Sequence, residues 1–118
     1  GVVTLYARAS AGRGDKALPI KTIAEKCVWA PGTAVIAYCA VPQNPPGRDF
    51  LMNWYMGVSH TVDSFWKVDA SAGTVEEIFT PDRAIALDAE RLTMDSSGSY
   101  IAFMNATDKT LWMLSLNK

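Results

Sequence analysis

Apolar residues recur at every second position along several short stretches of the chain. The alternation is clear at Val35, Ala37 and Cys39, and again at Ile101 and Phe103. Residues that favour turns, chiefly Gly, Pro, Asn, Asp and Ser, separate such stretches at 30–33, 71–73, 95–98 and 105–108. A period of two places alternate side chains on opposite faces of a strand, so the pattern predicts an all-β chain of short strands joined by tight turns.

Residues 83–92 are the one stretch that could form a short helix. Ala, Leu and Glu favour a helix there by propensity, but the apolar spacing does not distinguish a helix from a strand. We therefore expect a strand in this region and keep a short helix as the alternative.

An internal repeat organises these strands. Residues 25–29 align with residues 90–94, and residues 35–38, after the turn, align with residues 100–103. A third strand repeats an aromatic position at Tyr6, Trp66 and Trp112, and Trp112 follows Trp66 by 46 residues. That spacing is typical of one four-stranded blade of a β-propeller.

The repeat divides the chain into three parts of one domain. With the strands of a blade labelled A to D, residues 1–24 supply C and D of a partial blade, with D at 17–23. Residues 25–80 form one blade, with D at 74–79 and an insertion at about 42–62, and residues 81–118 supply A, B and C of another. The expected fold is therefore antiparallel and propeller-like, with nine strands in about two and a half blades and an incomplete ring.

The segments 65–69 and 95–103, with Leu111 and Trp112 after them, resemble the repeats of TolB-type β-propellers. In that family a hairpin with a turn rich in Ser, Asp or Gly precedes a third strand that reads Leu-Trp and then Asp. Residues 65–69 read Phe-Trp-Lys-Val-Asp and residues 95–98 read Asp-Ser-Ser-Gly. The resemblance covers residues 27–118 apart from the insertion, and residues 2–23 more loosely. It implies a propeller architecture related to that of WD-repeat proteins, and a protein of the cell envelope. The signature Trp-Asp dipeptide of WD repeats is absent from this sequence.

Two and a half blades do not close a ring, because closed propellers hold about four to eight. The chain is expected to be a fragment of a longer propeller, a unit that self-associates, or an open or sandwich-like stack. Joining strands A, B and C to C and D of another copy leaves one strand redundant, which favours the fragment. An isolated monomer would expose blade faces that carry Trp29, Phe103 or Trp112.

The charge balance excludes some classes of partner. Eleven basic and twelve acidic residues give a net charge of −1, which argues against a nucleic-acid partner. The longest apolar run, residues 34–41, is too short to span a bilayer as a helix. The expected partners are therefore neighbouring blades, further copies of the chain or another protein.

Cys27 and Cys39 lie symmetrically about Thr33, within the first predicted hairpin. They should face each other on adjacent antiparallel strands, at a separation that a disulfide can bridge. The alternative is two ordinary buried thiols. Two cysteines without a further Cys and His pair do not complete a zinc site.

The sequence presents no catalytic constellation, cofactor site or metal site. His60 is the single histidine, and no glycine-framed nucleophile turn accompanies its neighbours, so we expect a solvated loop residue. Any chain with twelve acidic residues offers a carboxylate pair on paper. We therefore expect turn and surface roles for the five carboxylates that could form such a pair, Glu76, Glu77, Asp82, Asp88 and Glu90.

The insertion is the most distinctive local feature of the chain. It begins with a Pro- and Gly-rich loop and continues with the aromatic and apolar residues 50–56. As a binding loop it would present Arg48, Trp54 and Tyr55 to a partner. The alternative, which we prefer, is that Phe50, Leu51, Trp54 and Met56 fold back and cap the core of the adjacent blade.

These features favour a non-enzymatic scaffold or binding module without cofactors. The facing cysteines and the TolB resemblance point to an extracytoplasmic location, in the periplasm, at the cell surface or in secretions. The alternative function is a propeller fragment of a larger hydrolase whose catalytic residues lie outside this sequence.

Overall fold

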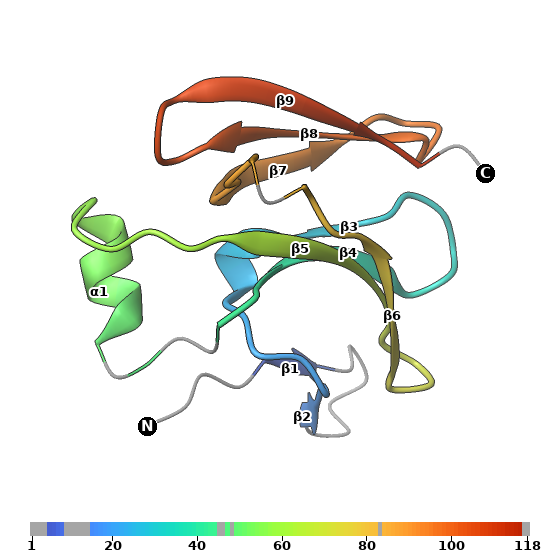
Figure 1. The fold of residues 1–118 in the computed structure, drawn as a ribbon. Helices are drawn as coiled ribbons and strands as arrows, with labels where there is room; N and C mark the ends of the chain where they lie inside the picture. Colours follow the sequence, from blue (N-terminus) through green and yellow to red (C-terminus); the bar gives the residue numbers. More distant parts are fainter. Residues whose placement is uncertain (1–4, 9–14, 45–46, 48, 83, 117–118) are drawn as a thin grey trace.

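The computed structural model describes residues 5–8, 15–44, 47, 49–82 and 84–116 and has nine strands, one short α-helix and one 3-10 helix. Figure 1 shows the arrangement. In chain order the elements are β1 (Tyr6–Arg8), β2 (Asp15–Ala17), η1 (Ala24–Lys26), β3 (Cys27–Trp29), β4 (Ile36–Pro42), α1 (Phe50–Tyr55), β5 (Asp63–Asp69), β6 (Thr74–Phe79), β7 (Ala89–Met94), β8 (Tyr100–Asn105) and β9 (Thr110–Ser115).

The strands form three antiparallel sheets, so the prediction of an all-β chain is confirmed. The orders are β1-β2, β3-β4-β5-β6 and β7-β8-β9, and none of these sheets closes on itself. The two larger sheets contain the strands that the repeat grouped together, and β6 has the predicted bounds 74–79. The helical alternative at 83–92 is wrong, because residues 89–94 form β7.

The prediction of a strand at 17–23 is wrong, because β2 ends at Ala17. Leu18, Ile20 and Thr22 are buried, while the residues between them are exposed. The Thr22 hydroxyl donates to the carbonyl oxygen of Ala40 at 2.7 Å. The alternating pattern here therefore belongs to an extended crossing segment that packs on the four-stranded sheet without joining it.

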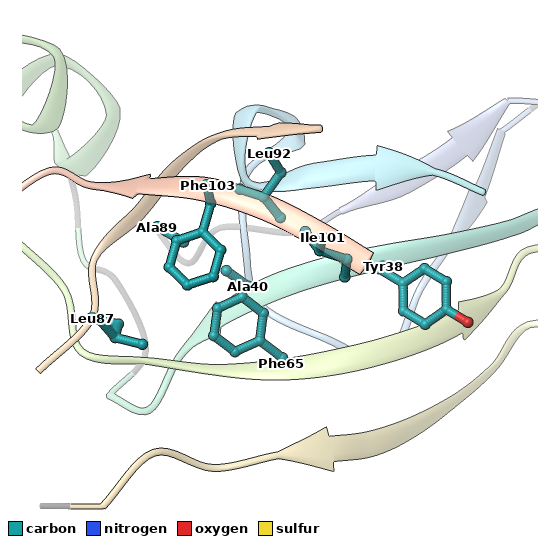
Figure 2. Packing of buried hydrophobic residues seen from close by; sticks show 8 residues of the cluster. All are labelled: Tyr38, Ala40, Phe65, Leu87, Ala89, Leu92, Ile101 and Phe103. Carbon is teal, nitrogen blue, oxygen red and sulfur yellow. The ribbon is translucent and has the colours of Figure 1, made fainter. Parts of the chain in front are cut away.

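The three sheets stack face to face, with β3–β6 between the other two (Figure 1). The core between β3–β6 and β7–β9 contains Phe65 and Phe103, whose ring centroids lie 5.0 Å apart (Figure 2). On its opposite face β3–β6 packs against Leu5, Leu18 and Ile20. Phe103, which we expected at an exposed blade face, is therefore 2% exposed in the main core, whereas Trp29 is 58% exposed.

The strand register corrects the repeat alignment by one residue. Trp29 pairs with Ala37, whereas Met94 pairs with Ile101, so Ala37 and not Ile36 is the counterpart of Ile101. The connection at 30–35 is one residue longer than the connection at 95–99, which accounts for the slip. A shift of one residue moves every side chain to the other face of a strand, so the correction decides which faces correspond.

With the corrected register, equivalent faces of the two larger sheets point the same way along the stack. In β3–β6 this face packs on the N-terminal layer, and in β7–β9 the equivalent face packs on β3–β6. The matched positions are Ala37 and Ile101, Cys39 and Phe103, Trp66 and Trp112, and Val68 and Leu114.

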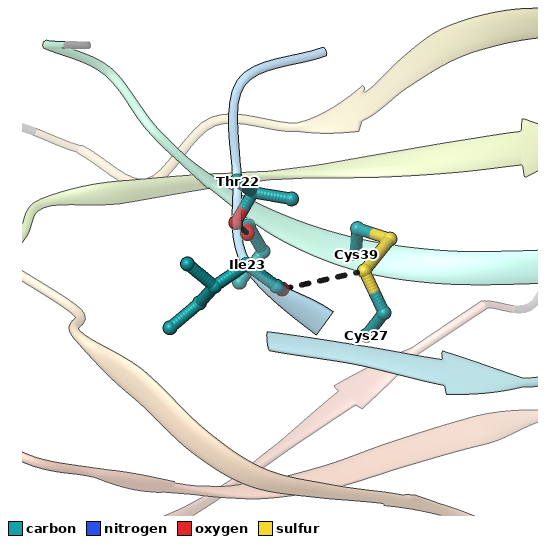
Figure 3. The surroundings of a disulfide bond; sticks show 5 residues. Thr22, Ile23, Cys27 and Cys39 are labelled. Carbon is teal, nitrogen blue, oxygen red and sulfur yellow. Dashed lines mark hydrogen bonds between the residues drawn. A yellow bond between two sulfur atoms is a disulfide. The ribbon is translucent and has the colours of Figure 1, made fainter. Parts of the chain in front are cut away.

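Cys27 and Cys39 face each other across β3 and β4, as predicted, with their sulfurs at bonding distance (2.13 Å) and their Cα atoms 4.1 Å apart (Figure 3). Cys39 is fully buried and belongs to the core beneath β3–β6. Its counterpart in the next sheet is Phe103, so the cysteine pair occupies a position that the second sheet fills with an aromatic side chain.

Among the described residues, none of the helices has both the length and the apolar character needed to cross a bilayer.

Candidate functional site

The inserted segment between β4 and β5 carries a short amphipathic helix, α1, which the sequence pattern did not predict. Asp49 precedes the helix with φ at +63°, a left-handed conformation that turns the chain into it. Phe50 and Trp54, four residues apart, share one face and pack with Ile23. A helix of six residues is too short to give a repeating apolar pattern. The spacing of four residues between Phe50 and Trp54 is the sequence signal that could have predicted it.

A buried lysine ties this helix to both large sheets. Lys26, at the end of η1, is fully buried, and its Nζ donates to Asp63 Oδ2 at 2.6 Å and to Asp88 Oδ1 at 2.7 Å. The same nitrogen donates to the carbonyl oxygen of Ala89 at 2.9 Å and lies 5.0 Å from the ring centroid of Trp54. Both carboxylates are fully buried as well. One ammonium group therefore binds Asp63 of β5, Ala89 of β7 and Asp88 in the segment before β7.

Asp88 is the hub through which the insertion is held. Trp54 Nε1 donates to its two oxygens at 2.9 and 3.1 Å, and Thr61 Oγ1 donates at 3.0 Å. His60 Nδ1 lies 2.9 Å from Asp88 Oδ2. The backbone N–H of Asp88 in turn donates to Asn105 Oδ1 at 3.0 Å, which links the hub to the end of β8.

The two carboxylates of the network have opposite pKa shifts. Burial dominates at Asp63 and raises its pKa above the ordinary value, despite the charge and hydrogen bond of Lys26. Burial would also raise the pKa of Asp88, but the hydrogen bond and charge of Lys26, with the hydrogen bonds from Trp54 and His60, outweigh it and lower that pKa. Asp63 Oδ1 is buried without a hydrogen bond to the described residues. The ionised form of Asp63 is therefore less stabilised than the ionised form of Asp88, in line with its raised pKa.

An open cleft of about 640 Å³ lies beside this network and is lined by residues of η1, α1, β7 and the β8–β9 connection. The hydroxyl of Tyr55, one of the lining residues, donates to Glu25 Oε2, and this hydrogen bond raises the pKa of Tyr55. Among the other lining residues, Lys109 Nζ lies 3.0 Å from Glu90 Oε2. A bulge in β7, with Arg91 at φ +54°, turns both Glu90 and Arg91 towards the cleft.

One expectation about a single residue is confirmed and one is wrong. His60 is an exposed loop residue, as expected, and its Nδ1 also lies 2.9 Å from Asp88 Oδ2. Asp88 is not a surface residue, because it is fully buried. Lys26 was missed altogether, since nothing in its local sequence distinguishes a buried lysine from a surface one.

The residues predicted in the insertion divide between core and surface. Trp54 is buried, with its indole anchored on Asp88, whereas Tyr55 is 62% exposed at the mouth of the cleft. Phe50 and Trp54 are buried, but they pack with Ile23 in a cluster separate from the sheet cores, so their capping of a blade core stays a prediction. The capping interpretation is wrong for Leu51 and Met56, which are exposed. Arg48 lies outside the described residues, so its contact role stays a prediction.

No group of three or more His, Cys, Asp or Glu side chains in the described part of the chain is placed to hold a metal ion. Comparison with known proteins found no matching family model, no matching curated protein and no matching solved structure.

Proposed function

We propose that the chain is a propeller-type scaffold module that binds another protein through helix α1 and the adjoining cleft. The proposal joins two features of the molecule. One is a stack of repeated sheets, and the other is an insertion whose helix α1 contacts Asp88 and Lys26 through Trp54.

The stacking supports the propeller part of the proposal. Blades of a propeller pack front to back, so equivalent faces follow one another in the same sense. After the register correction, Cys39 and Phe103 are equivalent and each packs on the preceding layer. A two-sheet sandwich related by a local two-fold axis would instead bring equivalent faces together.

The single observation that carries the binding part is the asymmetry of α1. Its inner face is anchored by Phe50 and Trp54, while Met52, Tyr55 and Met56 are 67%, 62% and 61% exposed. Large exposed apolar groups gathered on one element mark interaction sites, and a preformed surface loses little conformational entropy on binding. The Lys26 network supplies that preorganisation, because it fixes the inner face of the helix to both large sheets.

The cleft beside the helix defines the chemistry of the partner. Glu25, Glu90, Arg91 and Lys109 line the cleft together with Trp54 and Tyr55, so both signs of charge surround its aromatic residues. An apolar anchor surrounded by a polar rim is the usual anatomy of a protein interface. The paired cysteines fit an oxidising compartment, and we propose an extracytoplasmic location.

The test compares variants that change the exposed face of α1 without touching its anchors. Met52→Ser, Tyr55→Ser and Met56→Ser are combined in one protein, and Trp54 is kept because its loss would disrupt the hub. The matched control carries Val35→Ser and Ile85→Ser, which are 46% and 38% exposed in the wild-type protein and lie outside α1 and β9. Partners captured by wild type from its source are purified and titrated against each variant by calorimetry.

We expect the α1 variant to lose at least about 2 kcal/mol of binding free energy to a purified partner, the range of interface hot spots. The control variant should bind as wild type does, and both variants should melt at the wild-type temperature. Equal binding by wild type and the α1 variant would refute α1 as the contact site.

A further inference from the structure

The edge strand β9 differs from its counterpart β5 in one respect. Trp66 on β5 and Trp112 on β9 occupy equivalent positions, and both strands pair with the preceding strand of their sheet. β5 also pairs on its other side with β6. Among the described residues, β9 has no strand on that side.

The hydrogen bonding of β9 shows which backbone groups face outward. The N–H of Leu116 donates to the carbonyl oxygen of Ser99 at 2.8 Å, next to the Tyr100 and Ser115 pair. Hydrogen-bonded pairs alternate along an antiparallel ladder, so Trp112 and Leu114 bond to β8. The N–H and C=O groups of Leu111 and Met113 therefore point away from the sheet.

A groove of about 350 Å³ lies beside this edge, over β6. Its apolar walls include Tyr38, Ile78 and Phe79 from the four-stranded sheet, and Leu114 and Leu116 from the end of β9. Phe79 is 41% exposed, although its ring centroid lies 6.2 Å from that of buried Phe65. The face of β6 that a fourth strand of the neighbouring sheet would cover is thus uncovered.

We propose that this edge binds an extended segment of a partner protein, which adds to β9 as an antiparallel fourth strand. The β5 and β6 pair of the same chain is the template, because β6 occupies the equivalent place in the preceding sheet. The segment would span about six residues, the length of β9, with apolar side chains at alternate positions over Phe79 and Leu114. The groove is lined by two acidic residues, Glu76 and Glu77, and by one basic residue, Lys67, which pairs with Glu76, so its remaining negative charge favours a basic residue in the segment.

This surface is separate from α1, so the proposal stands independently of the proposed function. The probe is a fluorescent peptide of residues 73–80 that carries Glu76→Lys and Glu77→Lys, which keeps the apolar pattern of β6 and supplies the basic charge. The control peptide adds Ile78→Pro, which disrupts an extended hydrogen-bonded strand. Binding is followed by fluorescence anisotropy.

The decisive protein variants are Met113→Pro and Met113→Ala. Proline removes only an outward N–H and leaves the bonds to β8, whereas alanine removes the exposed side chain and keeps the N–H. We expect Met113→Ala to bind the peptide as wild type does and Met113→Pro to bind about ten-fold more weakly, the effect of one or two backbone hydrogen bonds. Exchange of the Met113 amide in wild type should slow when peptide is added.

Further variants keep the test valid if proline disturbs the fold. Phe79→Ser should weaken peptide binding and Phe79→Leu should restore most of it, because the groove requires an apolar wall. Equal affinity of wild type and a folded Met113→Pro protein, or unchanged Met113 amide exchange, would overturn the proposal. A wild-type dimer in light scattering that Met113→Pro converts to a monomer would also overturn it, because a second copy would then occupy the edge.

Discussion

Replacing Lys26 by methionine tests how far the buried network holds the molecule together. The substitution keeps the length of the side chain and removes the ammonium. Asp63 Oδ2 then retains only the Ala89 N–H at 2.9 Å, and Asp88 loses its nearest donor. Removing one partner of a buried ion pair costs about 3–5 kcal/mol, because the remaining charge stays buried and uncompensated.

That loss is large against the roughly 5–15 kcal/mol by which domains of this kind are stable. We expect urea unfolding, followed by circular dichroism and tryptophan fluorescence, to show a free energy of unfolding lower by about 3–5 kcal/mol for Lys26→Met. The matched control is Lys109→Met, which breaks the exposed pair with Glu90. Surface pairs contribute about 0–1 kcal/mol, so the control should remain close to wild type.

A double variant separates loss of charge compensation from loss of packing. Asp63→Asn in the Lys26→Met background removes the carboxylate with the raised pKa and keeps an oxygen that accepts the Ala89 N–H. The second substitution should recover part of the lost stability, so the two changes should not be additive. A Lys26→Met cost equal to that of Lys109→Met, or strict additivity in the double variant, would refute the reasoning.

Three further predictions concern the pH dependence, the cysteine pair and the core. Burial raises the pKa of Asp63 above its ordinary value of 3.8, so the contribution of this carboxyl to stability is lost as pH rises from 3 towards 7. In urea titrations across that range, the stability of Asp63→Asn relative to wild type should therefore increase with pH, and a decrease would contradict the direction of the pKa shift. Thiol titration of the denatured, unreduced protein should find no free thiol, and reduction of the pair of Cys27 and Cys39 should cost about 3 kcal/mol by the closure of a loop spanning 12 residues; two titratable thiols would exclude the bond. Phe103→Ala should cost about 3–5 kcal/mol in chemical denaturation, because it opens a cavity against Phe65, whereas Met113→Ala should stay within about 0.5 kcal/mol; similar costs would place the core elsewhere.

Much of the strand layout could be predicted from local sequence. Alternation and turn chemistry act within a few residues, so they located β6 and placed Cys27 opposite Cys39 without knowledge of the rest of the chain. The same reasoning failed at residues 18–23, where alternate burial serves an extended segment outside the sheets. Periodicity reports which side chains are buried and does not report whether the backbone pairs with a neighbour.

The candidate site could be predicted only in part. The insertion and exposed Tyr55 were visible as an aromatic segment that interrupts the repeat. The roles of Lys26 and Asp88 were not, because they depend on contacts between residues 62 positions apart. A lysine is buried only where the fold brings carboxylates close enough to neutralise it, and the local sequence pattern does not show which distant residues come together.

The sequence by itself determined the all-β character, most strands of the two larger sheets and the facing cysteines, since each follows from alternation, turns and short hairpins. Only the tertiary structure decided which faces of the two larger sheets correspond, because a single extra residue in the connection at 30–35 reverses the orientation of a whole strand. It also decided that α1 is held on a buried charge network and that β9 is an edge strand among the described residues. These features arise where distant segments pack together, and their energies come from desolvated charges and covered or uncovered apolar surface rather than from local conformational preference.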